Sequence, residues 1–182
     1  AAIVGRSMDA EGVLTPAMPA VDAGPWGTAG LGANQLDPKL CYRAPSTGVV
    51  DINPITQQMQ PVLRMIAAQS ALGMGRQIFF IGVPGCDTHD AQNTRHADLM
   101  AQLAQALDYW DATSRAMGVD QNVTLFTASD FGRAFSSNGD GTDHAWGNHW
   151  FALGGAVAGG QVLGQFPSLV LGGADDSDEG RG

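Results

Sequence analysis

Aspartate and histidine side chains gather in two segments of this chain. Asp87 and His89 come directly after one apolar run, and Asp130 comes directly after a second. Carboxylate and imidazole together form a borderline-hard ligand set, which suits Zn²⁺, Mn²⁺ or Fe better than Ca²⁺. We therefore expect a divalent metal ion, with zinc or manganese preferred, and these candidate ligands: Asp87, His89, Asp130, His144 and His149.

Each candidate also has a simpler interpretation. A single Asp or His in a loop is usually a solvated or capping residue, and Asp143 could hold a turn. His96 falls in the first turns of a predicted helix, where an exposed position is the more common one. Two carboxylates at one edge of a sheet repel each other unless a cation or proton lies between them. That repulsion favours the metal interpretation for Asp87 and Asp130.

The hydrophobic pattern predicts the elements that position these residues. Residues 77–83 form a continuous apolar run, which is typical of a strand covered on both faces, and residues 123–128 form another. Helical spacing predicts a long helix between them, from about residue 93 to 117, with Leu99, Leu103, Leu107 and Trp110 as its buried stripe. This order predicts a right-handed unit with two parallel strands, whose carboxyl ends would bring Asp87 and Asp130 together.

We therefore expect an α/β fold with a mostly parallel sheet flanked by helices. A third strand is expected near residues 150–153, after a polar Gly-rich loop at 129–148. Residues 1–51 are rich in Gly and Pro and lack clear periodicity, so we expect an irregular segment there and the α/β region at 52–182. Asn53 before Pro54 predicts a helix start, and Pro61 should kink that helix.

Composition excludes several functional classes. The formal net charge of −9 argues against a basic face for nucleic acid. No apolar run approaches the roughly 20 residues of a membrane-spanning helix. Cys41 and Cys86 either form a disulfide or are both small buried hydrophobes, and the second interpretation is favoured. Neither a phosphate-binding loop nor a Gly-x-Ser-x-Gly elbow is present. Without an initiator Met, and with a Gly- and Asp-rich end, the chain is expected to be part of a longer protein.

Three segments together resemble a known bacterial family. They are residues 76–89, 124–133 and 141–149, which contain Gly-Cys-Asp-Thr-His, Thr-Ala-Ser-Asp-Phe-Gly-Arg and Gly-Thr-Asp-His-Ala-Trp-Gly-Asn-His. Their order and spacing are similar to the C-terminal half of a domain-of-unknown-function family, whose members usually carry a twin-arginine export signal. That family is grouped with the alkaline phosphatase and sulfatase superfamily. The resemblance covers about residues 52–180 and implies a partial alkaline-phosphatase-like domain in a periplasmic or secreted protein.

The resemblance also implies a metal-dependent hydrolase of phosphate or sulfate esters. Asp87 matches the first Asp in the C-terminal half of that superfamily, Asp130 the Asp of its Asp–His pair, and His144 its final His. His89 could stand for the partner of Asp87, although the usual spacing is four residues and here it is two. Phe131 stands where the paired His would be, so the second metal position has lost a ligand. The superfamily's nucleophile comes from an N-terminal strand that has no match here.

The leading hypothesis is an exported hydrolase of a small anionic ester, with no nucleic-acid partner and no membrane span. Asp143 would hydrogen-bond a ligand imidazole. Arg133, a planar bidentate donor past the same strand end, would bind the anionic group of the substrate, although pairing with a surface Asp is as good an interpretation. The competing hypotheses are a non-catalytic secreted or cell-envelope binding domain, and a fragment that is inactive without its N-terminal half.

Overall fold

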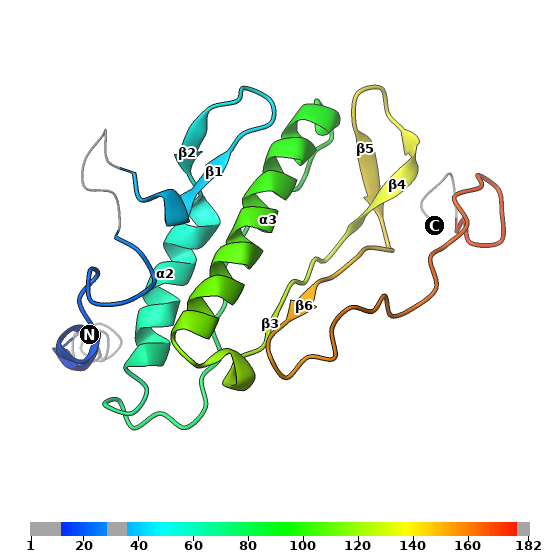
Figure 1. The fold of residues 1–182 in the computed structure, drawn as a ribbon. Coiled ribbons are helices and arrows are strands. Elements are labelled where there is room, and N and C mark those ends of the chain that lie inside the picture. The colour runs from blue at the N-terminus through cyan, green and yellow to red at the C-terminus, as the bar shows by residue number, and fades with distance from the viewer. Residues whose placement is uncertain (1–11, 29–35, 178–182) are drawn as a thin grey trace, which may run out of the picture. The chain divides into compact units, whose positions relative to one another are not determined.

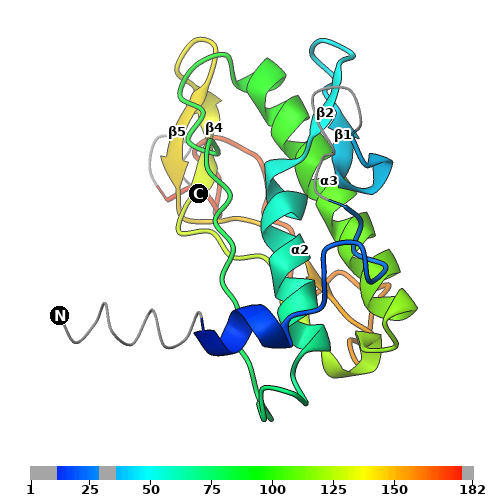
Figure 2. The ribbon, with the colours of Figure 1, turned by 90° about the vertical axis from the view of Figure 1, so that its left-hand side faces the viewer.

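The strands of this protein are short and pair two by two. The computed structural model describes residues 12–28 and 36–177 (Figure 1, Figure 2). Each pair in that part of the chain is antiparallel. The pairs are β1 (Cys41–Arg43) with β2 (Val50–Ile52), β3 (Leu125–Phe126) with β6 (Ala152–Leu153), and β4 (Gly132–Ser137) with β5 (Thr142–Ala145).

The expected mostly parallel, alkaline-phosphatase-like α/β sheet is wrong. All described strand pairs are antiparallel and two-stranded, and residues 77–83 form no strand. β3 covers two residues of the expected strand at 123–128, and its partner β6 lies within the expected third strand at 150–153. A local apolar pattern predicts where a segment is extended, but the partner of a strand depends on residues far away in the sequence. The local pattern therefore located these segments without specifying how they pair.

The expected polar loop at residues 129–148 contains a β-hairpin instead. β4 and β5 pair with Gly132 opposite Ala145 and Arg133 opposite His144, and the register shifts before Ser137. At the turn, the Asn138 N–H donates to the Gly141 carbonyl at 3.1 Å, and the Gly141 N–H donates to Asn138 Oδ1 at 3.1 Å. Asn and Gly are the residues that tight turns favour. The hairpin sets His144 across from Arg133.

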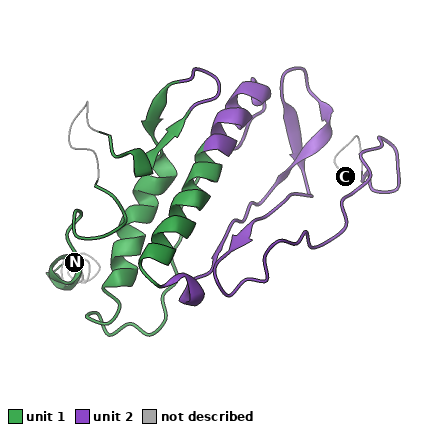
Figure 3. Cartoon of the chain, viewed as in Figure 1, with its two compact units in different colours: residues 1–43, 49–83, 102–118 green, residues 44–48, 84–101, 119–182 purple. Residues whose placement is uncertain are grey.

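The chain divides into two compact units (Figure 3). Unit 1 comprises residues 1–43, 49–83 and 102–118, and it contains the helix α2 (Pro54–Ala67). The side chain of Asn53 accepts a hydrogen bond from the Ile55 N–H at 3.0 Å, which confirms the expected helix start. The helix continues through Pro61. Its buried apolar residues recur at helical spacing: Ile55, Met59, Leu63 and Ile66.

The long helix α3 (Gln92–Ala116) is confirmed, and it belongs to unit 2 up to residue 101 and to unit 1 from residue 102. Of the expected buried stripe, Trp110 is buried, whereas the three leucines are only half-buried. Ala106, Tyr109, Thr113 and Ser114 are the other buried positions. The Tyr109 hydroxyl donates to the Trp26 carbonyl at 2.7 Å, and burial raises the pKa of that hydroxyl. Tyr109 and Trp110 therefore anchor the unit 1 part of α3.

Unit 2 comprises residues 44–48, 84–101 and 119–182, and it contains the β4–β5 hairpin (Figure 3). The segment 84–91 lies against this hairpin. The Gln92 N–H donates to the Asp140 carbonyl at 2.9 Å, and Asn138 Nδ2 donates to the His89 carbonyl at 3.0 Å. A Cβ atom at Gly141 would overlap the His89 carbonyl, so only glycine permits this approach. These contacts fix the segment that carries Asp87 and His89.

Three further expectations concern cysteines, the domain boundary and membranes. Cys41 and Cys86 are both thiols, and Cys41 is buried as expected, whereas Cys86 is exposed. The expected boundary between residues 51 and 52 falls within β2. In the part of the chain that the structure describes, no helix combines the length and the apolar character needed to cross a bilayer.

Candidate metal centre

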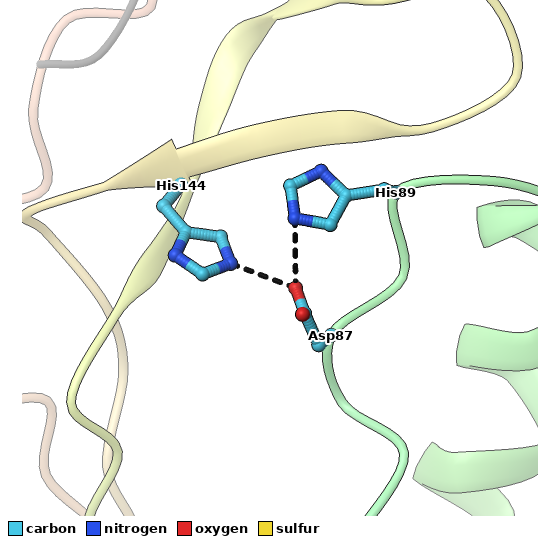
Figure 4. Close-up of side chains that lie close together, drawn as sticks. All are labelled: Asp87, His89 and His144. Atoms are coloured by element: carbon cyan, nitrogen blue, oxygen red, sulfur yellow. Dashed lines mark hydrogen bonds and ion pairs between the residues drawn. The ribbon is translucent and has the colours of Figure 1, made fainter.

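Three of the expected metal ligands come together in unit 2. Asp87 and His89 project from the segment before α3, and His144 projects from β5 toward them (Figure 4). Asp87 Oδ1 lies 2.7 Å from His144 Nε2 and 3.0 Å from His89 Nε2. One ligand atom from each of the three residues lies within 4.8 Å of the others. All three side chains are roughly half exposed, so a small molecule can reach them.

The charge of Asp87 is stabilised by its neighbours. A hydrogen bond from His144 holds the pKa of this carboxyl below its ordinary value of 3.8. Charge on His89 and His144 and a hydrogen bond from Arg133 act in the same direction, while desolvation opposes them. Asp87 is therefore a carboxylate at neutral pH, which is the form that binds a cation.

Asp143 orients the second imidazole. His89 Nδ1 lies 3.3 Å from Asp143 Oδ1, which is the kind of contact expected for Asp143 from the sequence. When a cation replaces the proton that lies between Nε2 and Asp87, an Nδ1–H donated to Asp143 leaves the lone pair on Nε2, which is the form of the imidazole that binds a metal. Asn138 Nδ2 donates to the same oxygen of Asp143 at 3.4 Å, so the carboxylate is itself held in place.

Arg133 is occupied by acceptors of the protein. Its Nη1 donates to the Thr142 carbonyl at 2.8 Å, and its Nη2 donates to the Cys86 carbonyl at 2.6 Å. Nη2 also lies 3.3 Å from Asp87 Oδ1, and the side chain is only 19% exposed. Of the two interpretations of Arg133, the geometry favours pairing with an Asp over binding an anionic substrate group.

Aromatic rings stack beside the three candidate ligands. The Phe131 and His144 rings have centroids 4.0 Å apart and planes 9° from parallel. The His89 and His144 rings stack at 5.0 Å and 24°. The guanidinium carbon of Arg133 lies 4.9 Å from the centroid of Phe131, which is within the range of a cation–π contact. The sequence does not predict that Phe131 stacks on His144, because this contact depends on how β4 and β5 pair.

The other residues that the sequence offered as metal ligands lie outside the cluster of Asp87, His89 and His144. Within residues 12–28 and 36–177, the group of close ligand atoms contains Asp87, His89 and His144 but not Asp130. Asp130 is exposed, and the parallel strands that would have brought it to Asp87 do not form. His149 stacks on Phe166 with centroids 5.3 Å apart, and His96 is exposed on α3.

Cys86, next to Asp87, has the wrong electrostatics for an activated nucleophile. Desolvation raises the pKa of its thiol above the ordinary value, and Arg133 acts in the opposite direction without cancelling the shift. The thiolate is the nucleophilic form, so a raised pKa leaves Cys86 mostly as the unreactive thiol at neutral pH.

Comparison with known proteins identifies a family. The family model described as "Protein of unknown function (DUF1501)" matches residues 48–177, a range that includes every residue of the candidate site. No curated protein and no solved structure matched the chain. The family match confirms the expected membership in a family of unknown function. Because it spans more than half of the 182 residues, this chain belongs to the DUF1501 family.

Proposed function

We propose that this protein is a metal-dependent hydrolase of phosphate or sulfate esters, with a zinc or manganese ion bound by Asp87, His89 and His144. The observation that carries the proposal is the convergence of two imidazole Nε2 atoms on one carboxylate oxygen. Two His residues and one carboxylate form a donor set found in catalytic zinc centres, which keep a further position open. The donor chemistry of the three residues therefore fits a divalent cation.

The surrounding residues support this assignment. Asp143 contacts His89 Nδ1, which leaves Nε2 of that ring to face Asp87. A divalent ion bound there would lower the pKa of a water molecule and polarise an ester oxygen. The exposure of the three ligands leaves access for a small anionic ester.

The reaction class rests on the sequence resemblance to the alkaline phosphatase and sulfatase superfamily, and only its chemistry is carried over. Phe131 stands where that superfamily has a second metal ligand, which supports one ion instead of two. Export by the twin-arginine pathway, and a periplasmic or secreted location, rest on the same resemblance. Cell fractionation with an antibody against the chain would test the location.

Metal binding is the direct test of the proposal. We expect the purified protein to bind about one Zn²⁺ or Mn²⁺ per chain in titration calorimetry and in elemental analysis. Asp87→Asn and His144→Gln should each weaken binding at least tenfold, because each removes a ligand while keeping the size of the side chain. Asp130→Asn is the matched control, because Asp130 is an exposed carboxylate outside the group, and its binding should equal that of the wild type.

Hydrolysis separates the proposed enzyme from the competing function. We expect the metal-loaded protein to hydrolyse p-nitrophenyl phosphate or p-nitrophenyl sulfate, and Asp87→Asn to lose this activity. Stoichiometric metal without hydrolysis would favour a non-catalytic binding domain. If neither metal nor hydrolysis is detected, the proposal is wrong.

A further inference from the structure

The orientation of His144 needs an explanation, because this side chain is 47% exposed. An exposed imidazole turns easily about its terminal torsion, for which the energy wells are broad. In this structure, however, Nε2 of His144 faces Asp87 Oδ1 at 2.7 Å. The contact with Asp87 holds one edge of the ring, and the rings stacked on its faces restrict its plane.

Phe131 lies flat against the imidazole, closer to it and more nearly parallel than the His89 ring, which stacks at 5.0 Å and 24°. The 4.0 Å centroid separation and 9° interplanar angle place the two rings face to face. A phenyl ring has no lone pair, so it can orient His144 without competing for a cation. Rotation of the imidazole out of this plane would break the stack, whereas its present plane keeps Nε2 toward Asp87.

Phe131 is itself held firmly. Its carbonyl accepts hydrogen bonds from Ser129 Oγ at 2.9 Å and from Asn148 Nδ2 at 3.0 Å. The Arg133 guanidinium lies over its ring at 4.9 Å and is bonded to the Cys86 and Thr142 carbonyls. The Cys86 carbonyl therefore holds Arg133, Arg133 lies over the Phe131 ring, and the Phe131 ring stacks on His144.

We infer that Phe131 is a positioning residue that fixes the imidazole plane of His144 toward Asp87. The effect of Phe131 on metal affinity rests on the proposed function, whereas its effect on the orientation of the His144 ring does not. Outer groups that orient metal ligands typically change affinity by 10- to 100-fold. The stack assigns this role to a residue that carries no metal-binding atom.

Nuclear magnetic resonance tests the orientation without any metal. In the wild type, the ring protons of His144 should carry a ring-current shift from Phe131. Phe131→Leu, which removes the ring and keeps an apolar side chain, should abolish that shift and also move the ¹⁵N resonance of His144 Nε2, which reports the contact with Asp87 Oδ1. Phe131→Tyr should keep both signals as in the wild type. Phe126→Leu is the control, because Phe126 is a 68% exposed phenylalanine in β3 whose loss should leave the His144 signals unchanged. Phe131→Met serves as a second ring-free variant if Phe131→Leu does not fold.

Zinc titration measures the consequence. We expect Phe131→Leu to bind Zn²⁺ about tenfold more weakly than the wild type, and Phe131→Tyr to restore the wild-type Kd. An unchanged His144 spectrum in both folded ring-free variants would overturn the inference. So would an unchanged Kd in those variants, provided that the wild type binds zinc. If the wild type binds neither Zn²⁺ nor Mn²⁺, the proposed function fails, and the His144 spectrum alone decides the inference.

Discussion

At the scale of single residues, the carboxylates of unit 2 differ in what surrounds them. Asp87 faces two imidazoles and a guanidinium, whereas Asp130 is exposed and outside that group. Asp98 on α3 is a third case, because its partner is neutral. Ser46 donates to Asp98 twice, from its N–H at 3.0 Å and from its hydroxyl at 2.5 Å. These two bonds link residues that are far apart in the sequence.

The Ser46–Asp98 contact predicts a pH-dependent stability. The hydroxyl of Ser46, followed by its N–H, lowers the pKa of Asp98 below its ordinary value of 3.8. A carboxyl with a depressed pKa in the folded state stabilises the fold above its unfolded pKa, and this contribution is lost as the pH falls through the folded pKa. We therefore expect Asp98→Asn to be less stable than the wild type at pH 7 in urea unfolding, with the difference shrinking as the pH falls through the lowered pKa of Asp98.

Ser46→Ala provides the control for this prediction. It removes the hydroxyl donor, so the pH-dependent effect of Asp98→Asn should be smaller when Ser46→Ala is already present. If Asp98→Asn changed the free energy of unfolding by the same amount at pH 7 and at the lowest pH at which the protein stays folded, the charge of Asp98 would not be the source of the stabilisation.

The sequence predicted which residues form the cluster of Asp87, His89 and His144 in the candidate site. Asp87, His89 and His144 were proposed from residue type and from position after apolar runs, and the structure brings these three together. Asp130 was proposed on the assumption of parallel strands, and that assumption failed. The role of Phe131 could not be predicted, because it depends on which residue β5 places beside it.

At the scale of elements, helices were predicted far better than strands. The cap at Asn53 and the boundaries of α3 follow from contacts between residues close in sequence, which local patterns encode. Strand pairing in β3 and β6 joins Leu125 to Leu153, and no local pattern specifies such a distant partner. The β4–β5 hairpin was missed although its turn contains Asn138 and three residues typical of turns, Gly139, Asp140 and Gly141.

Asn53 has two structural roles that a single substitution can test together. It caps α2, and its Nδ2 donates to the Gln102 carbonyl at 2.6 Å and to Gln105 Oε1 at 2.7 Å, while the residue is fully buried. Asn53→Ala loses the cap, which costs about 1 kcal/mol, and removes two hydrogen bonds to half-buried acceptors, each worth about 0.5–1.5 kcal/mol. We therefore expect the free energy of unfolding to fall by roughly 2–4 kcal/mol in urea titration.

Gln57→Ala is the matched control for this substitution. Gln57 is an exposed residue of the same helix, so its replacement should change stability by less than about 0.5 kcal/mol. Equal effects of the two substitutions would mean that the hydrogen bonds of Asn53 contribute nothing measurable.

At the scale of the whole molecule, some apolar side chains that the sequence pattern predicts to be interior are exposed. The residues 77–83 were expected to form a buried strand, yet Ile78 is 94% exposed and Phe80 is 95% exposed. Scattered exposed apolar residues are normal, but contiguous ones mark aggregation or interaction surfaces. The apolar pattern predicts burial, because burying an Ile or Phe side chain stabilises the fold by about 1.5–3 kcal/mol. In the structure, however, no described residue covers Ile78 or Phe80.

The exposure of Ile78 and Phe80 predicts that both can be replaced without loss of stability. The double variant Ile78→Ser with Phe80→Ser should unfold in urea within about 0.5 kcal/mol of the wild type, because neither side chain is packed. Sedimentation velocity over a range of concentrations should show less self-association, since the variant presents less apolar surface to a neighbouring molecule.

Leu63→Ala is the control for a buried position in the same urea unfolding assay. Leu63 is 0% exposed, so its truncation should cost about 2–5 kcal/mol. If the double serine variant were destabilised by a comparable amount, Ile78 and Phe80 would be buried in solution. The segment 77–83 would then be packed as the apolar pattern of the sequence predicts. Unchanged stability with reduced association would instead establish that the amino-acid pattern of an interior strand lies on the surface of this chain.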